Sequence, residues 1–326
     1  MDLTKFTVLD IGHGNCSIIE STNAYTIIDA AQGSDVQNIL IEKQIKQVDD
    51  LIISHSDKDH VGGAIAILLD DEIAVKRVHL NPDGIKSTDT WGDFRAAVAH
   101  SRTVHQTIVV TAMNSDSEDI VYPDYKLEVL APSAVDCITG PGSTGISGKI
   151  LDSNSMSIVL RLIHDGANVA LIPGDMNGDT LEFLKNENKC LDAKILVFPH
   201  HGGKPKNDDP EKFAKELCEK VDPDLVLFSN SRHKHDNPIP SVISGVKSSN
   251  CGAYLACTQM SSSCCDNEAQ LSNLHLSDSF PSKGKIKNHS CAGSVTIALQ
   301  GSNTDINQPL NAHGNYVSNF PKRKCQ

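Results

Sequence analysis

The residues of this chain with the most evident capacity for chemistry lie in the stretch LIISHSDKDHVGG, which begins at Leu51. His55, Asp57, Asp59 and His60 all stand within six residues, directly after an apolar run. Imidazole and carboxylate groups together suit Zn²⁺, Mn²⁺ or Fe²⁺, and the large share of oxygen ligands favours Mn²⁺. Alternate residues of an extended loop project to one side, so this stretch predicts a metal-binding loop.

Two elements must position this loop. The apolar run before His55 predicts a buried strand, and VGGAIAILLDD, residues 61–71, has apolar residues at helical spacing. Gly62 and Gly63 allow the backbone to pack closely where the helix begins. The candidate ligands are therefore expected between a strand and a helix, where a rigid scaffold aims several side chains at one point.

Further candidate residues stand near the ends of other predicted strands. MSIVLRLIHD and ANVALIPGD, residues 156–165 and 167–175, predict a hairpin with Asp175 at its tip. The strand AKILVFPHH, residues 193–201, ends in His200 and His201. A later loop, NSRHKHDNPIP, contains His235. Each of these side chains is a type that binds metals or transfers protons.

Strands and helices occur in both halves of the chain, and no internal repeat of fixed period is visible. This pattern favours an α/β fold in which two sheets pack together with helices outside, an αββα sandwich. We predict a single domain over residues 1–326. A polar insertion rich in Ser, Asn and Cys covers roughly residues 260–288, between the last two predicted strands.

The stretch H-S-D-K-D-H-V-G-G resembles the signature H-x-H-x-D-H-x-G-G of the metallo-β-lactamase fold hydrolases, with Asp57 in place of the second histidine. It is closer to the motif H-x-D-x-D-H-x-G-G in the hydrolase domain of ComEC-type competence proteins. The segments FTVLDIGHGNCSIIE, SNSMSIVLRL, LIPGD and VFPHHGG resemble further motifs of that branch, in the same order. The resemblance covers roughly residues 5–300 without the insertion, and it implies the metallo-β-lactamase fold.

The resemblance implies a centre that holds two divalent metal ions, Mn²⁺ or Zn²⁺, with Mg²⁺ as a further option. His55 and Asp57 would bind the first ion, and Asp59 and His60 the second. Asp175 would bridge the two ions. The last histidine ligand of the second ion would be His235.

Other roles follow from the same resemblance. Asp59 would also orient the attacking hydroxide, and His200 or His201 would protonate the leaving alkoxide; the residues alone do not separate these two histidines. Asn154 and Ser155 either contact the substrate or cap the following strand. His13 replaces a family residue in the first turn, and we expect it to pack behind the ligands.

The cysteines allow a second metal site. Six of the ten cysteines follow residue 250, and a disulfide framework is uncommon in cytosolic proteins. Four of them, together with His289, surround the ends of the insertion: Cys257, Cys264, Cys265 and Cys291. If the two flanking strands are neighbours, these sulfurs bind a structural Zn²⁺. Because they form no C-x-x-C pair, free thiols in a loop are the alternative.

The charge of the chain limits its partners. A net charge of −12 at pH 7 argues against a general nucleic-acid-binding surface. Contact with a nucleic acid would therefore depend on bound metal ions or on a partner protein. No apolar run approaches the roughly 20 residues that cross a bilayer, and no secretion signal is visible. We expect a cytoplasmic protein without membrane contact.

These features predict a metal-dependent phosphodiester hydrolase with DNA as the favoured substrate. It would act with a partner protein, for instance as a defence effector. A first alternative is a hydrolase of small molecules such as a cyclic nucleotide, phosphonate, lactone or thioester, because one fold hosts many functions. A second alternative is a binding module that keeps the ligands for stability, although candidate ligands at every matched motif argue against it.

Overall fold

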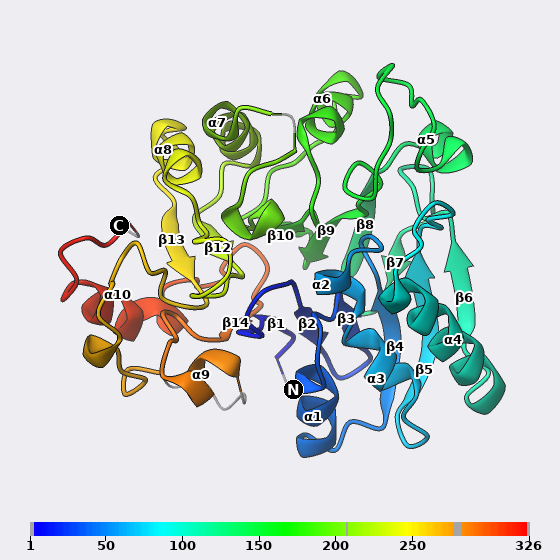
Figure 1. Cartoon of the computed structure of the whole chain (residues 1–326), viewed down its shortest axis with the longest axis horizontal. Helices are drawn as coiled ribbons and strands as arrows, with labels where there is room; N and C mark the ends of the chain where they lie inside the picture. Colours follow the sequence, from blue (N-terminus) through cyan, green and yellow to red (C-terminus); the bar gives the residue numbers. More distant parts are fainter. Residues whose placement is uncertain (1–2, 207, 277–281, 325–326) are drawn as a thin grey trace.

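The computed structural model describes residues 3–206, 208–276 and 282–324, and two seven-stranded sheets lie face to face within it (Figure 1). The first sheet has the order β14-β1-β2-β3-β4-β5-β6. Its strands are β1 (Lys5–Val8), β2 (Ser17–Glu20), β3 (Tyr25–Ile28), β4 (Gln47–Ile52), β5 (Ala74–Leu80), β6 (Ile108–Thr111) and β14 (Val295–Ala298).

The second sheet has the order β13-β12-β11-β10-β9-β8-β7. Its strands are β7 (Ile120–Val121), β8 (Lys126–Ala131), β9 (Val159–His164), β10 (Ala167–Ile172), β11 (Ile195–Val197), β12 (Leu225–Phe228) and β13 (Tyr254–Cys257). Buried side chains from both sheets, among them Phe6, Ile28, Leu160 and Ile297, form one apolar layer between them. Because such strands are covered on both faces, they read in sequence as short continuous apolar runs.

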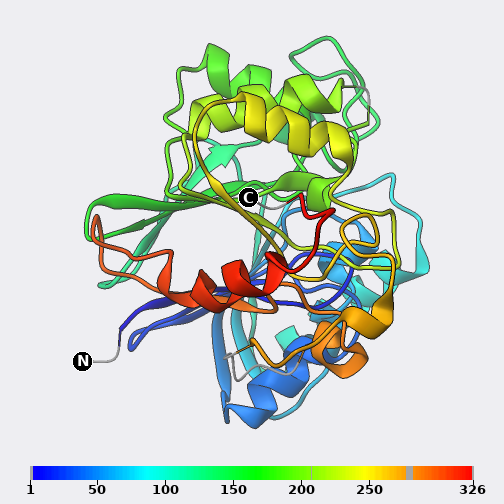
Figure 2. The same ribbon diagram turned by 90° about the vertical axis from the view of Figure 1, so that its left-hand side faces the viewer.

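Helices cover the outer face of each sheet (Figure 2). The helices α1 (Asp35–Glu42), α3 (Ala64–Leu68) and α4 (Asp89–Val104) share an apolar cluster with the first sheet. The helices α6 (Gly178–Asn186), α7 (Pro210–Val221) and α8 (Pro240–Ser248) share another with the second sheet. The predicted αββα sandwich is therefore confirmed.

Shorter elements connect these layers. They are the helices α2 (Lys58–Val61), α5 (Ala134–Thr139), α9 (Lys283–Lys287) and α10 (Asn311–Val317), and the 3₁₀ turns η1 (Pro199–Gly202), η2 (Glu268–Gln270) and η3 (Gln308–Leu310). In Figure 1, α10 lies at the end of the sandwich near β13 and β14. There Tyr254 Oη lies 2.8 Å from His313 Nδ1, which ties α10 to β13.

Parallel strands bring the candidate residues to one edge of the sandwich. In the first sheet β3, β4 and β5 run parallel, and in the second sheet β10 to β13 do. Asp29 follows β3, His55 follows β4, Asp175 follows β10 and His200 follows β11. Because loops at the carboxyl ends of parallel strands share an edge, residues distant in sequence meet there.

The prediction that Asp175 stands at the tip of a hairpin is wrong. The hairpin β9–β10 does form, but its two-residue turn is Asp165–Gly166, and Asp175 follows the opposite end of β10. Both turn residues have positive φ, 49° and 72°. A right-twisted hairpin favours such a turn, and Asp-Gly adopts it easily.

The predicted insertion joins the two sheets, because β13 and β14 belong to different sheets. It contains η2 and α9, and its residues 277–281 lie outside the described residues. The buried carboxylate of Asp10, in the loop after β1, accepts hydrogen bonds from Gln259 Nε2 at 2.8 Å, Ser290 Oγ at 2.8 Å and Ser282 Oγ at 3.1 Å. Asp10 thus anchors both ends of the insertion.

Asp10 is expected to make the stability of the fold depend on pH. Burial raises the pKa of Asp10 from 3.8 to about 6, although its hydrogen bonds lower it. The pKa of Asp10 is higher in the folded chain than in the unfolded chain. Its contribution to the free energy of unfolding is therefore fully present below pH 3.8 and is lost as pH rises through 6. From pH 4 to 7 the wild type should lose about 2 kcal/mol of unfolding free energy relative to Asp10→Asn.

Urea unfolding of both chains at several pH values measures this difference. Asp71→Asn, at an exposed carboxylate, is the control and should follow the wild type. Curves for the wild type and Asp10→Asn that run parallel over this range would contradict the prediction.

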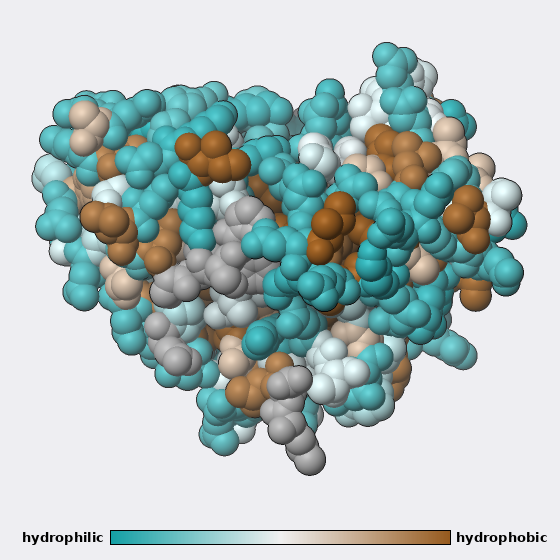
Figure 3. Space-filling view, turned by 90° about the horizontal axis from the view of Figure 1, so that it is seen from below, coloured by the Kyte–Doolittle hydropathy of each residue, from teal (hydrophilic) through white to brown (hydrophobic). Residues whose placement is uncertain are grey.

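Within the described residues, no helix combines the length and apolar character needed to span a membrane. The face in Figure 3 is mostly hydrophilic, with separate apolar groups. Exposed large apolar side chains such as Ile41, Ile138 and Leu274 belong to different elements. Scattered exposed apolar residues of this kind are ordinary in folded proteins.

Candidate metal centre

His55, His60 and Asp175 form one group of ligating side chains, with donor atoms within 4.8 Å of one another. All three are buried, and His60 Nε2 lies 3.3 Å from Asp175 Oδ1. Burial and the neighbouring His60 lower the pKa of His55 to about 4. His55 is therefore neutral at pH 7, the form in which an imidazole binds a metal.

Asp29 orients His60 from behind. His60 Nδ1 lies 2.8 Å from Asp29 Oδ2, and Ser54 donates to the same carboxylate through its N–H at 2.7 Å and its hydroxyl at 2.8 Å. Burial alone would lower the pKa of His60, but Asp175 and Asp29 raise it well above its usual value. A cation that binds at Nε2 must therefore displace a proton.

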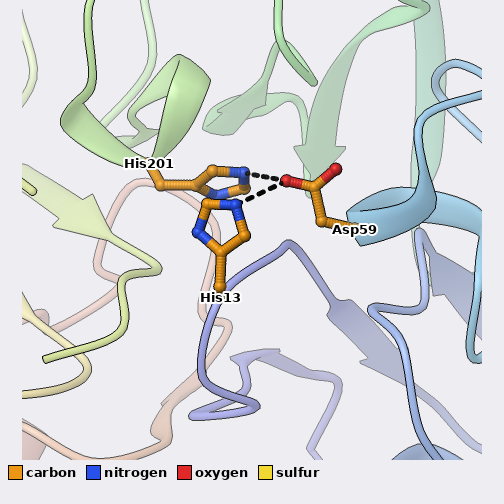
Figure 4. Close-up of side chains that lie close together, drawn as sticks. All are labelled: His13, Asp59 and His201. Atoms are coloured by element: carbon orange, nitrogen blue, oxygen red, sulfur yellow. Dashed lines mark ion pairs between the residues drawn. The ribbon is translucent and has the colours of Figure 1, made fainter. Parts of the chain in front are cut away.

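His13, Asp59 and His201 form a second group (Figure 4). His13 comes from the turn after β1, Asp59 from α2 and His201 from η1. Asp59 Oδ2 lies 2.9 Å from His13 Nε2 and 3.3 Å from His201 Nε2. Burial alone would raise the pKa of Asp59, but the neighbouring His13 and His201 hold it well below its usual range.

Asp175 links the two groups. Its Oδ1 accepts the backbone N–H of His200 at 3.0 Å, and its Oδ2 lies 3.4 Å from His200 Nδ1 and 3.9 Å from His201 Nε2. Burial would raise the pKa of Asp175, but His60, His200 and His201 hold it well below its usual range. Both η1 histidines have left-handed φ, 53° and 56°, a strained conformation that is common at functional sites.

These residues fit divalent metal ions. The Nε2 atoms of His55, His60, His200 and His201 are buried and lack hydrogen-bond partners among the described residues. Ligands bound tetrahedrally at 2.0–2.1 Å lie about 3.3 Å apart. The separations of His60 from Asp175 and of His201 from Asp59 are both 3.3 Å, longer than a good hydrogen bond.

Asp57 lies beside the first group. Its carboxylate pairs with Lys86 Nζ, and its Oδ2 is 3.8 Å from His55 Nε2. The structure thus groups the ligands differently from the family pattern, since it places His60 with His55 and Asp59 with two other histidines. The position of His60 follows from its bond to Asp29.

A cavity of about 420 Å³ opens over the second group and over Asp175 of the first. It is lined by His13, Asp59, Asp175, His200, His201, Gly203, Lys204, His235, Asn237 and Ile239. His235 is exposed at its rim, with its ring centroid 4.9 Å from that of His13. Among the described residues His235 belongs to neither group of three ligands.

Asn154 and Ser155 do not line this cavity. Ser155 Oγ donates to Asp152 Oδ1 at 2.9 Å and accepts from Asp152 N–H at 2.7 Å, so it closes a local turn. Asn154 Oδ1 is buried without a hydrogen-bond partner in the described part of the chain. Ser155 therefore makes local contacts before β9, which favours the structural role over contact with a substrate.

The four cysteines around the insertion are buried in one apolar cluster. Their segments are neighbours, as the zinc prediction required: Cys291 N–H donates to Thr258 O at 2.9 Å, and Ala292 N–H to Cys257 O at 2.8 Å. Cys291 Sγ lies 3.1 Å from His313 Nε2. The three ligand groups within the described ranges do not include Cys257, Cys264, Cys265 or Cys291, so a structural zinc here stays a prediction.

Sequence reasoning missed Asp29, and it expected His13 to pack behind the ligands, whereas His13 is a member of the second ligand group. The turn Gly12-His13-Gly14 packs directly on α2, and a Cβ at Gly14 would lie 2.3 Å from the carbonyl oxygen of Asp59. Gly14 has a φ of 125°, which side chains other than glycine rarely adopt. A histidine between two glycines directly after a strand was the available signal.

Asp29→Asn is expected to weaken metal binding about 10- to 100-fold. Asparagine tolerates the left-handed φ of 60° at this position. Its amide N–H₂ would face His60 Nδ1, which must then accept, so the ring proton would move to Nε2 and block the ligand position. Titration with Mn²⁺ or Zn²⁺ against a chelating dye measures the change, and Asp71→Asn is the control. Unchanged affinity in a folded Asp29→Asn chain would show that this bond does not set the state of His60.

Comparison with known families finds one match. The model of the Metallo-beta-lactamase superfamily matches residues 9–146. This range contains the strand–loop–helix stretch with His55 and Asp59, and it ends before Asp175. Together with the two covered sheets, the match identifies the architecture as the metallo-β-lactamase fold.

Curated relatives match over smaller shares of their own length. The chain is 28% identical over 195 residues to the probable glycine dehydrogenase (decarboxylating) subunit 2 of Staphylococcus epidermidis, which covers 55% of this chain and 36% of that protein. It is also 24% identical over 204 residues to ComE operon protein 3 of Bacillus subtilis. This matched region covers 63% of this chain and 23% of that protein. The matched regions thus span about a third and about a quarter of the length of these two relatives.

Two solved structures are also similar. The metallo-beta-lactamase fold protein YhfI from Bacillus subtilis is 9% identical with a TM-score of 0.49, over 78% of this chain and 97% of that chain. The metallo hydrolase Igni18 from Ignicoccus hospitalis is 14% identical with a TM-score of 0.46, over 79% of this chain and 95% of that chain.

Proposed function

We propose that this chain, which has the metallo-β-lactamase fold and matches that superfamily over residues 9–146, is a metal-dependent phosphodiester hydrolase with DNA as its substrate. One observation carries the proposal: two His–carboxylate groups meet at Asp175 beside an open cavity, and several of their ring nitrogens lack hydrogen-bond partners among the described residues. The match to ComE operon protein 3 supports the ComEC-like branch.

The residues have distinct roles in this reaction. The two groups would hold divalent ions, which would supply polarisation of a phosphoryl oxygen and activation of water at neutral pH. Asp175 holds the groups together, and Asp59 orients the attacking water. His200 and His201 both face carboxylates of the centre, so we assign them to holding the ligands. His235 lies at the rim without a carboxylate partner among the described residues, and we assign to it the donation of a proton to the leaving oxygen.

The net charge of −12 is compatible with this substrate. Two divalent ions outweigh the carboxylates of Asp57, Asp59 and Asp175, so the loaded centre is locally positive. Lys204, which also lines the cavity, adds to this attraction. Because the remaining surface repels a polyanion, we further propose that a partner protein delivers the DNA, as in a defence effector.

Incubation with linear and circular DNA in Mn²⁺, Mg²⁺ or Zn²⁺ tests the proposal. We expect cleavage that depends on the metal and is lost in Asp57→Ala/Asp59→Ala. Bis(p-nitrophenyl) phosphate is assayed in parallel. Turnover of this small diester without cleavage of either DNA would favour the small-molecule alternative. If the chain binds metal but hydrolyses neither DNA nor the small diester, the binding module is favoured.

His235→Ala is expected to slow DNA cleavage about 100-fold and to slow release of p-nitrophenolate less than about tenfold. An alkoxide needs a proton to leave, whereas p-nitrophenolate leaves without one. Rates on the two substrates at saturating metal measure the difference. If both hydrolysis rates fall equally and the variant also binds one metal ion less, His235 is instead a metal ligand, as the resemblance implies.

A further inference from the structure

A third group of ligating side chains lies outside the cavity: His233, Glu268 and His289, with donor atoms within 4.8 Å of one another. His233 stands in the loop after β12, Glu268 begins η2, and His289 follows α9. Glu268 Oε1 lies 3.3 Å from His233 Nε2, and Glu268 Oε2 lies 3.4 Å from His289 Nε2. Three segments of the chain thus converge on one carboxylate.

We propose that His233, Glu268 and His289 form a separate site for a divalent cation of the Zn²⁺ class. The site would fasten the polar insertion to the loop that carries His235. Two imidazoles and one carboxylate are a known zinc ligand set that leaves a fourth position for water. Because His233 and Glu268 are half-exposed, an ion reaches the site directly from solvent.

The geometry favours a metal over simple hydrogen bonds. Separations of 3.3 and 3.4 Å exceed those of good N–H···O bonds. They match the distance of about 3.3 Å between two ligands on one tetrahedral zinc ion. His289 is itself buried. Its Nδ1 is buried without a hydrogen-bond partner among the described residues.

Arg232 holds the carboxylate in position. Its buried guanidinium donates to Met260 O at 3.0 Å and to Cys265 O at 2.7 Å. Its Nε donates to Glu268 Oε1 at 3.3 Å. The carboxylate is therefore oriented before an ion binds, with Oε2 toward His289. The positive charge of Arg232 opposes a cation, so this site should fill at higher metal concentrations than the centre around Asp175.

The site would connect the insertion with the cavity. Its ligand His233 is two residues from His235, which lines the cavity rim. A bound ion would join this loop to η2 and to the end of α9, in addition to the bond between Arg232 and Glu268. Its role is to hold the rim in place, and this does not depend on the reaction that the centre performs.

Metal content of the full chain tests the proposal. Wild type, His233→Ala and Glu268→Gln are equilibrated with excess Zn²⁺, freed of unbound metal, and analysed for zinc per chain by mass spectrometry. Both variants should hold one equivalent less than the wild type. His100→Ala, at an exposed histidine 3.0 Å from Asp71, is the matched control and should lose none. Equal zinc content in the wild type and both variants would overturn the proposal.

A second arm separates this site from the centre. In Asp175→Ala, zinc bound at the centre falls, but the equivalent at His233 should remain and should disappear when His233→Ala is added. Melting temperatures without metal should be similar in the wild type, His233→Ala and Glu268→Gln, whereas the rise caused by Zn²⁺ should be smaller in the two variants. A rise that is the same in all three chains would also overturn the proposal.

Discussion

Asp175→Asn is expected to reduce phosphodiester hydrolysis on the order of 10³-fold. The carboxylate of Asp175 faces both ligand groups, at 3.3 Å from His60 Nε2 and 3.9 Å from His201 Nε2. Asparagine keeps the size of the side chain and can still accept the backbone N–H of His200, but it removes the negative charge between two cations. The variant should also hold at least one metal ion less than the wild type.

Rates at saturating metal and metal content per chain measure this effect. The control is again Asp71→Asn, whose carboxylate lies at the surface and which should keep full activity. An Asp175→Asn chain that retains wild-type activity and metal content would refute a centre joined by Asp175. A changed melting temperature alone, with no activity in either chain, would favour the binding module.

Gly14→Ala is expected to lower the free energy of unfolding by about 3–5 kcal/mol. At a φ of 125°, a Cβ would lie 2.3 Å from Asp59 O and 2.4 Å from Ala31 Cβ. Neither neighbour can retreat easily, because Asn15 N–H donates to the same Asp59 carbonyl at 3.1 Å. Relief of the clash would separate His13 from Asp59, so metal binding should fall together with stability.

Urea unfolding of Gly14→Ala beside Gly92→Ala checks this prediction. Gly92 lies within α4, and a Cβ there meets nothing within 4 Å. Gly92→Ala should therefore stabilise the chain by up to about 1 kcal/mol, because alanine is the better helix former. A Gly14→Ala chain as stable as the wild type would show that the turn adopts another conformation without loss.

Much of the architecture could be predicted from local patterns. The strand before His55, the amphipathic α7 and the apolar runs of β9 to β12 each carry their own periodicity, and together they indicate two sheets with outer helices. The short helices α5, α8 and α10 were not predicted. The position of Asp175 was misjudged although the turn Asp165–Gly166 was readable.

The sequence by itself determined that a metal-ligand loop exists, because His55, Asp57, Asp59 and His60 are contiguous and follow one strand. Which ligands act together was decided only by the tertiary structure. The bond of His60 to Asp29 spans 31 residues, and Asp59 meets His13 and His201 from distant loops. A ring nitrogen is aimed by whatever holds the other side of the ring. For His60 that partner is Asp29, which follows another strand of the sandwich, and no local pattern encodes it.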